Sequence, residues 1–305
     1  MRKILIALLL SFSAIVVNAC DICGCASGAS YIGLLPSFQR SFIGIRYESQ
    51  DFFSKPHDMN DEHYAASHEQ FKTTEIWGRY TPFKRIQIFG FIPYHFNDRS
   101  EGWVPVHTQG IGDLQFLMNY VIFNTSITSS SRLKQSLQLG AGLKLPTGKS
   151  DLVKNGLFVH QNMQTGTGSY DVPVNVIYTM KHKTSGLHGE INYRWNGTNK
   201  MGYSFGNKLN GALTFLQWIE HKKLTYLPQF GFNAEHADSD KQNNTFVEYT
   251  GGNTVLATAG CDIYQKSLSF GLRLSQPIYQ QMGNGYTHGK TRISVSIIYL
   301  FKKQH

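Results

Sequence analysis

The sequence predicts an all-β protein, a single transmembrane antiparallel β-barrel of about 12 strands that follows a signal peptide. Three observations predict this fold. Many segments alternate apolar and polar residues, long and short connections follow one another between them, and no apolar run after residue 19 is long enough for a membrane-spanning helix. A membrane protein without such a helix crosses the bilayer as a closed barrel, because an open sheet leaves unpaired backbone groups in lipid.

The first residues have the features of a secretory signal peptide. Arg2 and Lys3 give a positive start, residues 4–17 are apolar, and residues 17–19 include small side chains at the cleavage position. Export without a second apolar helix leaves the periplasm, the outer membrane or secretion. The predicted organisation is a signal peptide at 1–19, a cysteine-rich N-terminal segment at 20–37 and an outer-membrane β-barrel at 38–305.

The strand prediction rests on the two-residue period of side chains in an extended chain. In residues 132–146, Leu139 and Leu143 lie on one face, whereas Lys144 lies on the other. The same pattern predicts twelve strands, at 38–49, 70–81, 85–96, 110–124, 132–146, 170–182, 186–196, 205–219, 223–236, 253–264, 267–277 and 289–302.

The connections between these strands predict an orientation. Outer-membrane barrels have short periplasmic turns and longer outside loops. An even number of strands then returns both barrel termini to the periplasm, which predicts the cell outer membrane as the location. A last alternating strand that ends in Phe301 is typical of chains recognised by the barrel assembly machinery, so we expect this machinery and outer-membrane lipid as partners.

The charge composition speaks against a nucleic acid partner. The formal net charge is +9, but the Lys and Arg residues are scattered and no basic run exceeds two residues. A basic surface close to anionic lipid or solutes is the simpler interpretation.

Charged residues on the polar faces predict a wet interior, because they would be costly in the core of a soluble sandwich. We expect a passive, porin-like channel or transporter for small solutes, and not an enzyme. The sequence does not identify the solute. An excess of arginine over acidic residues in this set predicts a preference for anionic or polar solutes. The predicted lumen-lining residues are Asp113, Lys144, Glu190, Arg194, Arg273 and Arg292.

The cysteines near the new N-terminus suggest an alternative, a metal-handling barrel. Cys20, Cys23 and Cys25 lie within six residues, and thiolates at this spacing can bind copper or zinc. A disulfide is equally open in an oxidising compartment, as is lipidation of Cys20. Cys261 lies on the apolar face of its strand and is predicted to face lipid.

A second alternative is a membrane-embedded lipid hydrolase. Such an enzyme needs a nucleophile beside a general base on the outer side. His188 and Ser204 are the candidates, but no nucleophile motif surrounds them.

Three glycine-containing motifs carry a family resemblance. They are Gly-Ile-Gly-Asp at 110–113, Leu-Pro-Thr-Gly-Lys at 145–149 and the segment 164–171. In this order they resemble the outer-membrane family named for the phenol-degradation meta-pathway, transporters related to the long-chain fatty-acid channels. The start CDICGC is similar to that of Bacteroidota barrel proteins described as transporters. The resemblance implies fold and location, not cargo, and the chain lacks the apolar N-terminal hatch of the fatty-acid channels.

Overall fold

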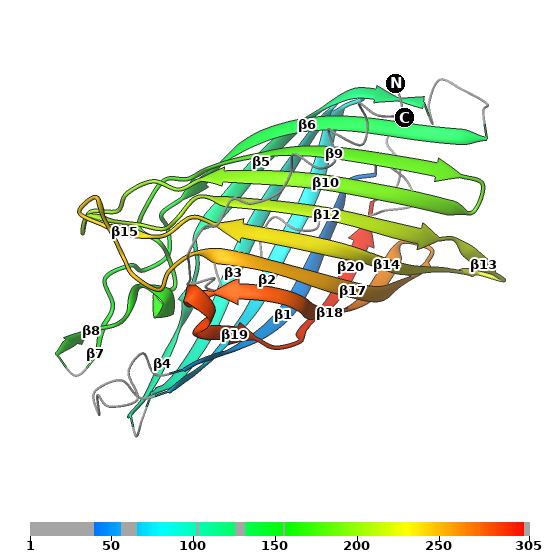
Figure 1. The fold of residues 1–305 in the computed structure, drawn as a ribbon. Coiled ribbons are helices and arrows are strands. Elements are labelled where there is room, and N and C mark those ends of the chain that lie inside the picture. Colours follow the sequence, from blue (N-terminus) through cyan, green and yellow to red (C-terminus); the bar gives the residue numbers. More distant parts are fainter. Residues whose placement is uncertain (1–39, 56–65, 102–103, 126–131, 155, 302–305) are drawn as a thin grey trace, which may run out of the picture.

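The computed structural model describes residues 40–55, 66–101, 104–125, 132–154 and 156–301. The predicted signal peptide and cysteine-rich segment lie outside these ranges. In the described part of the chain, no helix is long and apolar enough to cross a membrane. The described chain is nearly all β-strand, and twelve long antiparallel strands form a closed barrel (Figure 1).

Each barrel strand pairs with the next barrel strand in the sequence, and the last strand pairs with the first. This closure places Phe42 opposite Leu300. The twelve strands are β1 (Phe42–Ser54), β2 (Ser67–Phe83), β3 (Ile86–Glu101), β5 (Leu114–Asn124), β6 (Leu133–Leu145), β9 (Val172–His182), β10 (Ser185–Trp195), β12 (Lys208–Gln217), β14 (Leu224–Ala237), β17 (Gly252–Gln265), β18 (Leu268–Met282) and β20 (Arg292–Leu300).

The fold class and the strand number are therefore confirmed. One predicted strand, 110–124, is wrong in detail, because the chain forms β4 (Val104–Ile111) and β5 as separate strands. β4 pairs with the far end of β3, which extends to Glu101 where a loop was expected. The break follows from Gly112, where a Cβ atom would lie 2.4 Å from the imidazole of His95.

The outer face of the barrel is apolar and the inner face is mostly polar. On β6, Leu139 and Leu143 are 45% and 42% exposed, whereas Lys144, on the opposite face of the same strand, is 5% exposed. β20 repeats this pattern, with exposed Ile293 and Ile297. A soluble monomer rarely exposes so large a continuous apolar surface, but bilayer lipid covers such a surface.

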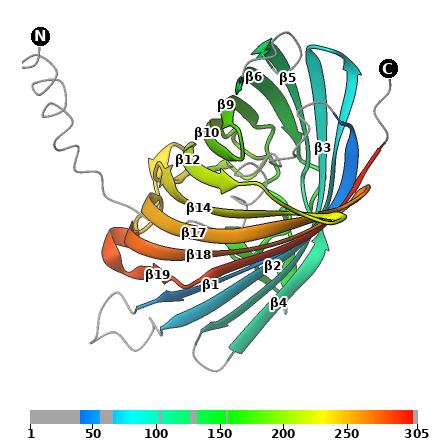
Figure 2. The ribbon, with the colours of Figure 1, turned by 90° about the vertical axis from the view of Figure 1, so that its right-hand side faces the viewer.

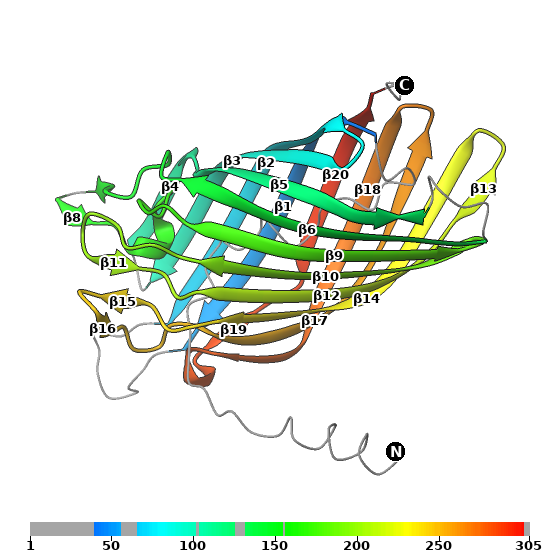
Figure 3. The same cartoon turned by 90° about the horizontal axis from the view of Figure 1, so that it is seen from above.

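The two ends of the barrel differ in their connections (Figures 1 and 3). One end, here called the turn rim, carries short turns, including two-residue turns at 183–184, 222–223 and 266–267. β13 (Ile219–His221) continues the wall there. The other end, the loop rim, carries the longer connections. Long and short connections alternate as the sequence predicted.

Several small elements lie at the loop rim (Figure 3). β19 (Thr287–Gly289) pairs with β1 and β18, and Figure 2 shows these three strands side by side. The remaining elements are β7 (Val153–Lys154), β8 (Leu157–Phe158), β11 (Tyr203–Ser204), β15 (Lys241–Gln242), β16 (Thr245–Phe246) and two 3₁₀ turns, η2 (Gln161–Met163) and η3 (Gly283–Gly285).

Two apolar layers occupy the interior, one toward each rim. The layer near the turn rim contains stacked rings, with the Trp77 and Phe91 centroids 6.4 Å apart. The layer near the loop rim joins Phe52 and Phe71 of the wall to Val159 and Met163. Both Thr108 and Asn97 donate hydrogen bonds to the Met163 carbonyl oxygen, so the 146–171 connection folds inward. Polar side chains occupy the space between the two layers.

Candidate solute chamber

A cavity of about 60 Å³, here called the chamber, lies in the polar part of the barrel interior. Small side chains form much of its wall, because small residues of β12, β17, β18 and β20 point inward there: Ala212, Thr214, Thr258, Ser275 and Ser294. Three arginines and Glu48 supply its charges. The arginines are Arg46, Arg273 and Arg292.

The chamber arginines have acidic or amide partners. Arg46 donates to Glu75 at 2.5 Å, and both side chains are buried. Arg273 donates to the Gln229 oxygen at 3.3 Å, and the Gln229 amide donates to Asp262 at 3.1 Å. Sequence reasoning identified two of these arginines but missed their partners, although each partner occupies an inward position in its own alternating strand.

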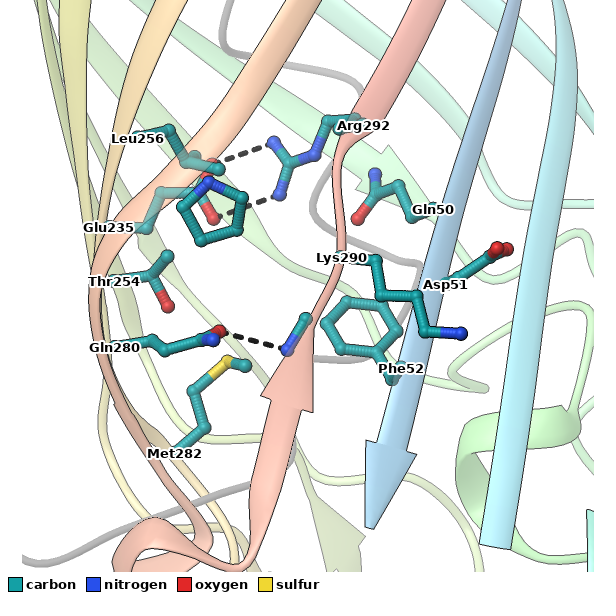
Figure 4. Close-up of a pocket in the computed structure, with 12 residues that line it drawn as sticks. Gln50, Asp51, Phe52, Glu235, Thr254, Leu256, Gln280, Met282, Lys290 and Arg292 are labelled. Carbon is teal, nitrogen blue, oxygen red and sulfur yellow. Dashed lines mark hydrogen bonds and ion pairs between the residues drawn. The ribbon is translucent and has the colours of Figure 1, made fainter.

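Arg292 joins the chamber to a second, smaller cavity of about 10 Å³ closer to the loop rim (Figure 4). Its guanidinium makes a bidentate pair with Glu235, at 2.8 and 3.2 Å, across the two intervening strands β17 and β18. At the outer side of this cavity Gln280 accepts a hydrogen bond from the Gly289 amide, beside Phe52.

Asp113 and Lys144, both predicted to line the lumen, form a compact charged cluster with Asp171. Lys144 Nζ lies 2.9 Å from Asp113 and 2.5 Å from Asp171, and all three side chains are buried. Asp113 also accepts from the amides of Gly148 and Thr167. The three motifs of the family resemblance therefore meet here. Their polar groups are used in holding the long connection, so this cluster is a structural one.

Glu190 and Arg194, the other predicted lumen residues, point inward from β10 and are buried. Glu190 accepts from Asn192 at 2.7 Å and lies 3.5 Å from His188. Arg194 reaches across β9 and β6 to Gln115 of β5, at 2.9 Å.

The charges that face the barrel interior are balanced once Lys134 and Lys181, the inward lysines beside the turns, are set apart. This balance removes the basis for the expected anion preference. That preference was inferred from the six predicted lumen residues, which leave out most of the acidic side chains of the interior. The basic members are Arg46, Arg79, Arg99, Lys144, Arg194, Lys208, Arg273 and Arg292, and the acidic ones are Glu48, Glu69, Glu75, Asp113, Asp171, Glu190, Glu235 and Asp262.

A buried carboxyl group holds the loop rim above β12. Asp240 accepts from the Tyr203 hydroxyl at 2.5 Å and from the Gly206 amide at 2.7 Å. Burial raises the pKa of Asp240, and these two hydrogen bonds oppose that shift. The group fixes the segment between β14 and β15 against β11.

The described residues provide no site for either alternative function, metal handling or lipid hydrolysis. Cys20, Cys23 and Cys25 lie outside the described ranges, and within those ranges no three His, Cys, Asp or Glu side chains form a metal-binding group. Cys261 is a free thiol on the outward face of β17.

The two candidate hydrolase residues are separate. His188 is buried inside the barrel and bonds to Thr179, at 3.0 Å, as well as approaching Glu190. Ser204 belongs to β11, which pairs with β15 at the loop rim. The structure thus gives Ser204 no bond to this imidazole.

The barrel is similar to a crystal structure of an outer membrane channel from Pseudomonas putida F1, with a TM-score of 0.62, 13% sequence identity, and 86% of this chain and 96% of that chain covered. The beta domain of the Bordetella autotransporter Brka follows, with a TM-score of 0.47, 10% identity, and 86% and 100% covered. At 13% identity, the similarity to the P. putida channel shows the fold alone. No family model and no curated protein matches the chain.

Proposed function

We propose that the protein is a passive outer-membrane channel for small polar solutes. The observation that carries the proposal is the chamber, a space of about 60 Å³ lined mostly by polar side chains, inside a closed barrel whose outer face is apolar. The P. putida structure, described as an outer membrane channel, supports this reading through its fold. Barrels of this size have interiors that range from filled to narrowly open.

The route along which a solute passes follows the small inward residues of β12, β14, β17, β18 and β20. Arg273 and Arg292 line it, whereas Glu190 and Arg194 fill the opposite wall. Because the interior charges balance, the favoured solutes are uncharged or zwitterionic and rich in hydrogen-bonding groups. Two apolar layers bound the route, so only small solutes pass.

The same proposal sets the orientation. The turn rim, where Phe42 and Leu300 meet, faces the periplasm, and the loop rim faces outward. The barrel assembly machinery inserts the chain, and the apolar face from β1 to β20 contacts outer-membrane lipid.

Liposome swelling tests the proposal. The full mature chain is reconstituted into phosphatidylcholine vesicles, and entry of arabinose, serine and sodium glutamate is followed by light scattering. We expect entry of arabinose and serine, with slower entry of glutamate. A barrel that is folded but admits none of these solutes contradicts the proposed channel.

A pair of variants on one strand locates the route. Thr214→Trp fills the chamber, whereas Leu213→Trp places the same ring on the lipid face. We expect Thr214→Trp to reduce swelling several-fold and Leu213→Trp to leave it unchanged. Equal swelling by both variants would exclude the chamber from the route.

A further inference from the structure

The turn rim is strongly basic. Every described connection at this end carries Lys or Arg, and Glu220 is the single acidic residue among residues 81–85, 124–125, 132–134, 181–185, 218–223 and 265–267. These basic residues, with one at the start of the first strand, are here called the collar. They are Arg40, Lys84, Arg85, Arg132, Lys183, Lys222, Lys223 and Lys266. Lys134 and Lys181, which lie opposite each other on β6 and β9, are left out because they point into the barrel, where the Lys181 ammonium lies 4.0 Å from the Trp218 ring.

The loop rim has no such bias in its described residues. Its exposed basic side chains, such as Lys149, Lys200 and Lys241, are interspersed with Asp151, Asp238 and Glu248. The barrel interior is balanced as well. Among the described residues the excess positive charge is therefore concentrated at one end, which the sequence alone presented as scattered charge.

Exposed aromatic rings mark the collar as a membrane boundary. Tyr80, Phe83 and Tyr120 lie on the outer face close to the turns and are 57%, 67% and 48% exposed. Arg85 donates a hydrogen bond to the Tyr120 hydroxyl at 3.2 Å. Amphipathic rings prefer the headgroup level of a bilayer, and long basic side chains extend from there toward the phosphates.

Three lysines of the collar have a backbone conformation that favours glycine. Lys183, Lys222 and Lys266 each start a two-residue turn with φ near +55° (54°, 55° and 55°). A left-handed φ is unfavourable for a residue with a Cβ atom. Each of these three turns nevertheless carries a lysine at its first position.

We propose that the collar is a binding surface for anionic phospholipid headgroups of the leaflet around the turn rim. The phosphate groups are the recognised chemistry, because ammonium and guanidinium donors bind phosphate oxygens and the ring of turns matches a ring of lipids. The partner is lipid and not a soluble acidic protein, since the aromatic rings place the collar at headgroup depth. This inference does not depend on whether the barrel conducts solutes.

Electron spin resonance with labelled lipids tests the inference. The full mature chain is reconstituted in phosphatidylcholine vesicles that contain a trace of spin-labelled phosphatidylglycerol or spin-labelled phosphatidylcholine. We expect phosphatidylglycerol to associate with the barrel at least about twofold more strongly than phosphatidylcholine, and we expect high salt to remove the difference.

Two variants with equal charge change localise the effect. Lys84→Gln/Arg85→Gln/Lys222→Gln/Lys223→Gln neutralises part of the collar, and Lys149→Gln/Lys200→Gln/Lys241→Gln/Lys290→Gln neutralises the loop rim. The collar variant loses the preference, and the loop variant keeps it. Equal association of both lipids with the native protein, or an equal loss in the loop variant, overturns the proposal. If the collar variant fails to fold, the effect of salt on the lipid preference of the native protein still tests the proposal.

Discussion

The two walls of the barrel share one fold but differ in what they present to the interior. From β2 to β10 the inward side chains are mostly large, such as Trp77, Phe91 and Arg194. From β12 to β20 many are small, such as Thr214, Thr258 and Ser294, and these line the chamber. Side-chain size, not strand geometry, thus decides where the barrel is filled and where it is open.

The largest expected difference between the walls concerns buried charge pairs. Glu75→Gln leaves Arg46 without its buried partner, and we expect a loss of about 3–5 kcal/mol in unfolding free energy. Glu235→Gln should cost less, roughly 1–3 kcal/mol, because the Arg292 side chain is 13% exposed, against 6% for Arg46, so water can solvate it more readily. Urea unfolding in lipid measures both, and equal losses would contradict the distinction.

Both walls require the same apolar outer face, which a charge on β6 tests. Leu139→Arg places a charge near the middle of the membrane, so we expect about 2–4 kcal/mol of destabilisation and failed assembly. Leu133→Arg is the control on the same face at the turn rim, where a charge costs about 0–1 kcal/mol. Electrophoretic mobility of unheated samples reports assembly, and efficient assembly of Leu139→Arg would overturn the assignment of faces.

Adding one heavy atom to a side chain probes packing on each side. Gly140 lies in the filled wall, where a Cβ atom would be 2.1 Å from the side-chain oxygens of Asn119 and Asn175. We expect Gly140→Ala to cost about 1–3 kcal/mol. Ala212→Ser adds one atom toward the chamber and should change stability by less than about 0.5 kcal/mol. A comparable loss in both variants, measured by urea unfolding, would show that the walls are equally packed.

The smallest effect is local and depends on pH. The raised pKa of Asp240 means that its protonated form favours the folded loop. The stabilisation is complete below the ordinary carboxyl pKa and is lost as pH rises through the raised value. Asp240→Asn should remove this dependence while the amide oxygen still accepts from Tyr203. Hydrogen exchange at 203–206, corrected for the intrinsic effect of pH, measures it, and unchanged pH dependence in the variant would contradict the assignment.

The sequence predicted the strand number, the two faces and the alternation of connections, since each depends on local spacing. The register of Leu139, Lys144 and the strand around them could be read from a two-residue period. The break between β4 and β5 could not, because it depends on contact between Gly112 and the His95 ring of another strand. The six proposed lumen residues were identified by polarity, but most of their partners were not; Asp113 and Lys144, which pair with each other, are the exception.

Alternation along each strand fixed which residues point inward, because successive Cβ atoms in an extended chain face opposite sides. The tertiary structure decided which inward residues meet. Arg292 pairs with Glu235, 57 residues away, and Lys144 joins Asp113 and Asp171 from separate connections. These contacts depend on how strands tilt and close into a barrel, which no single segment specifies. The same closure gathered scattered lysines and arginines into one collar.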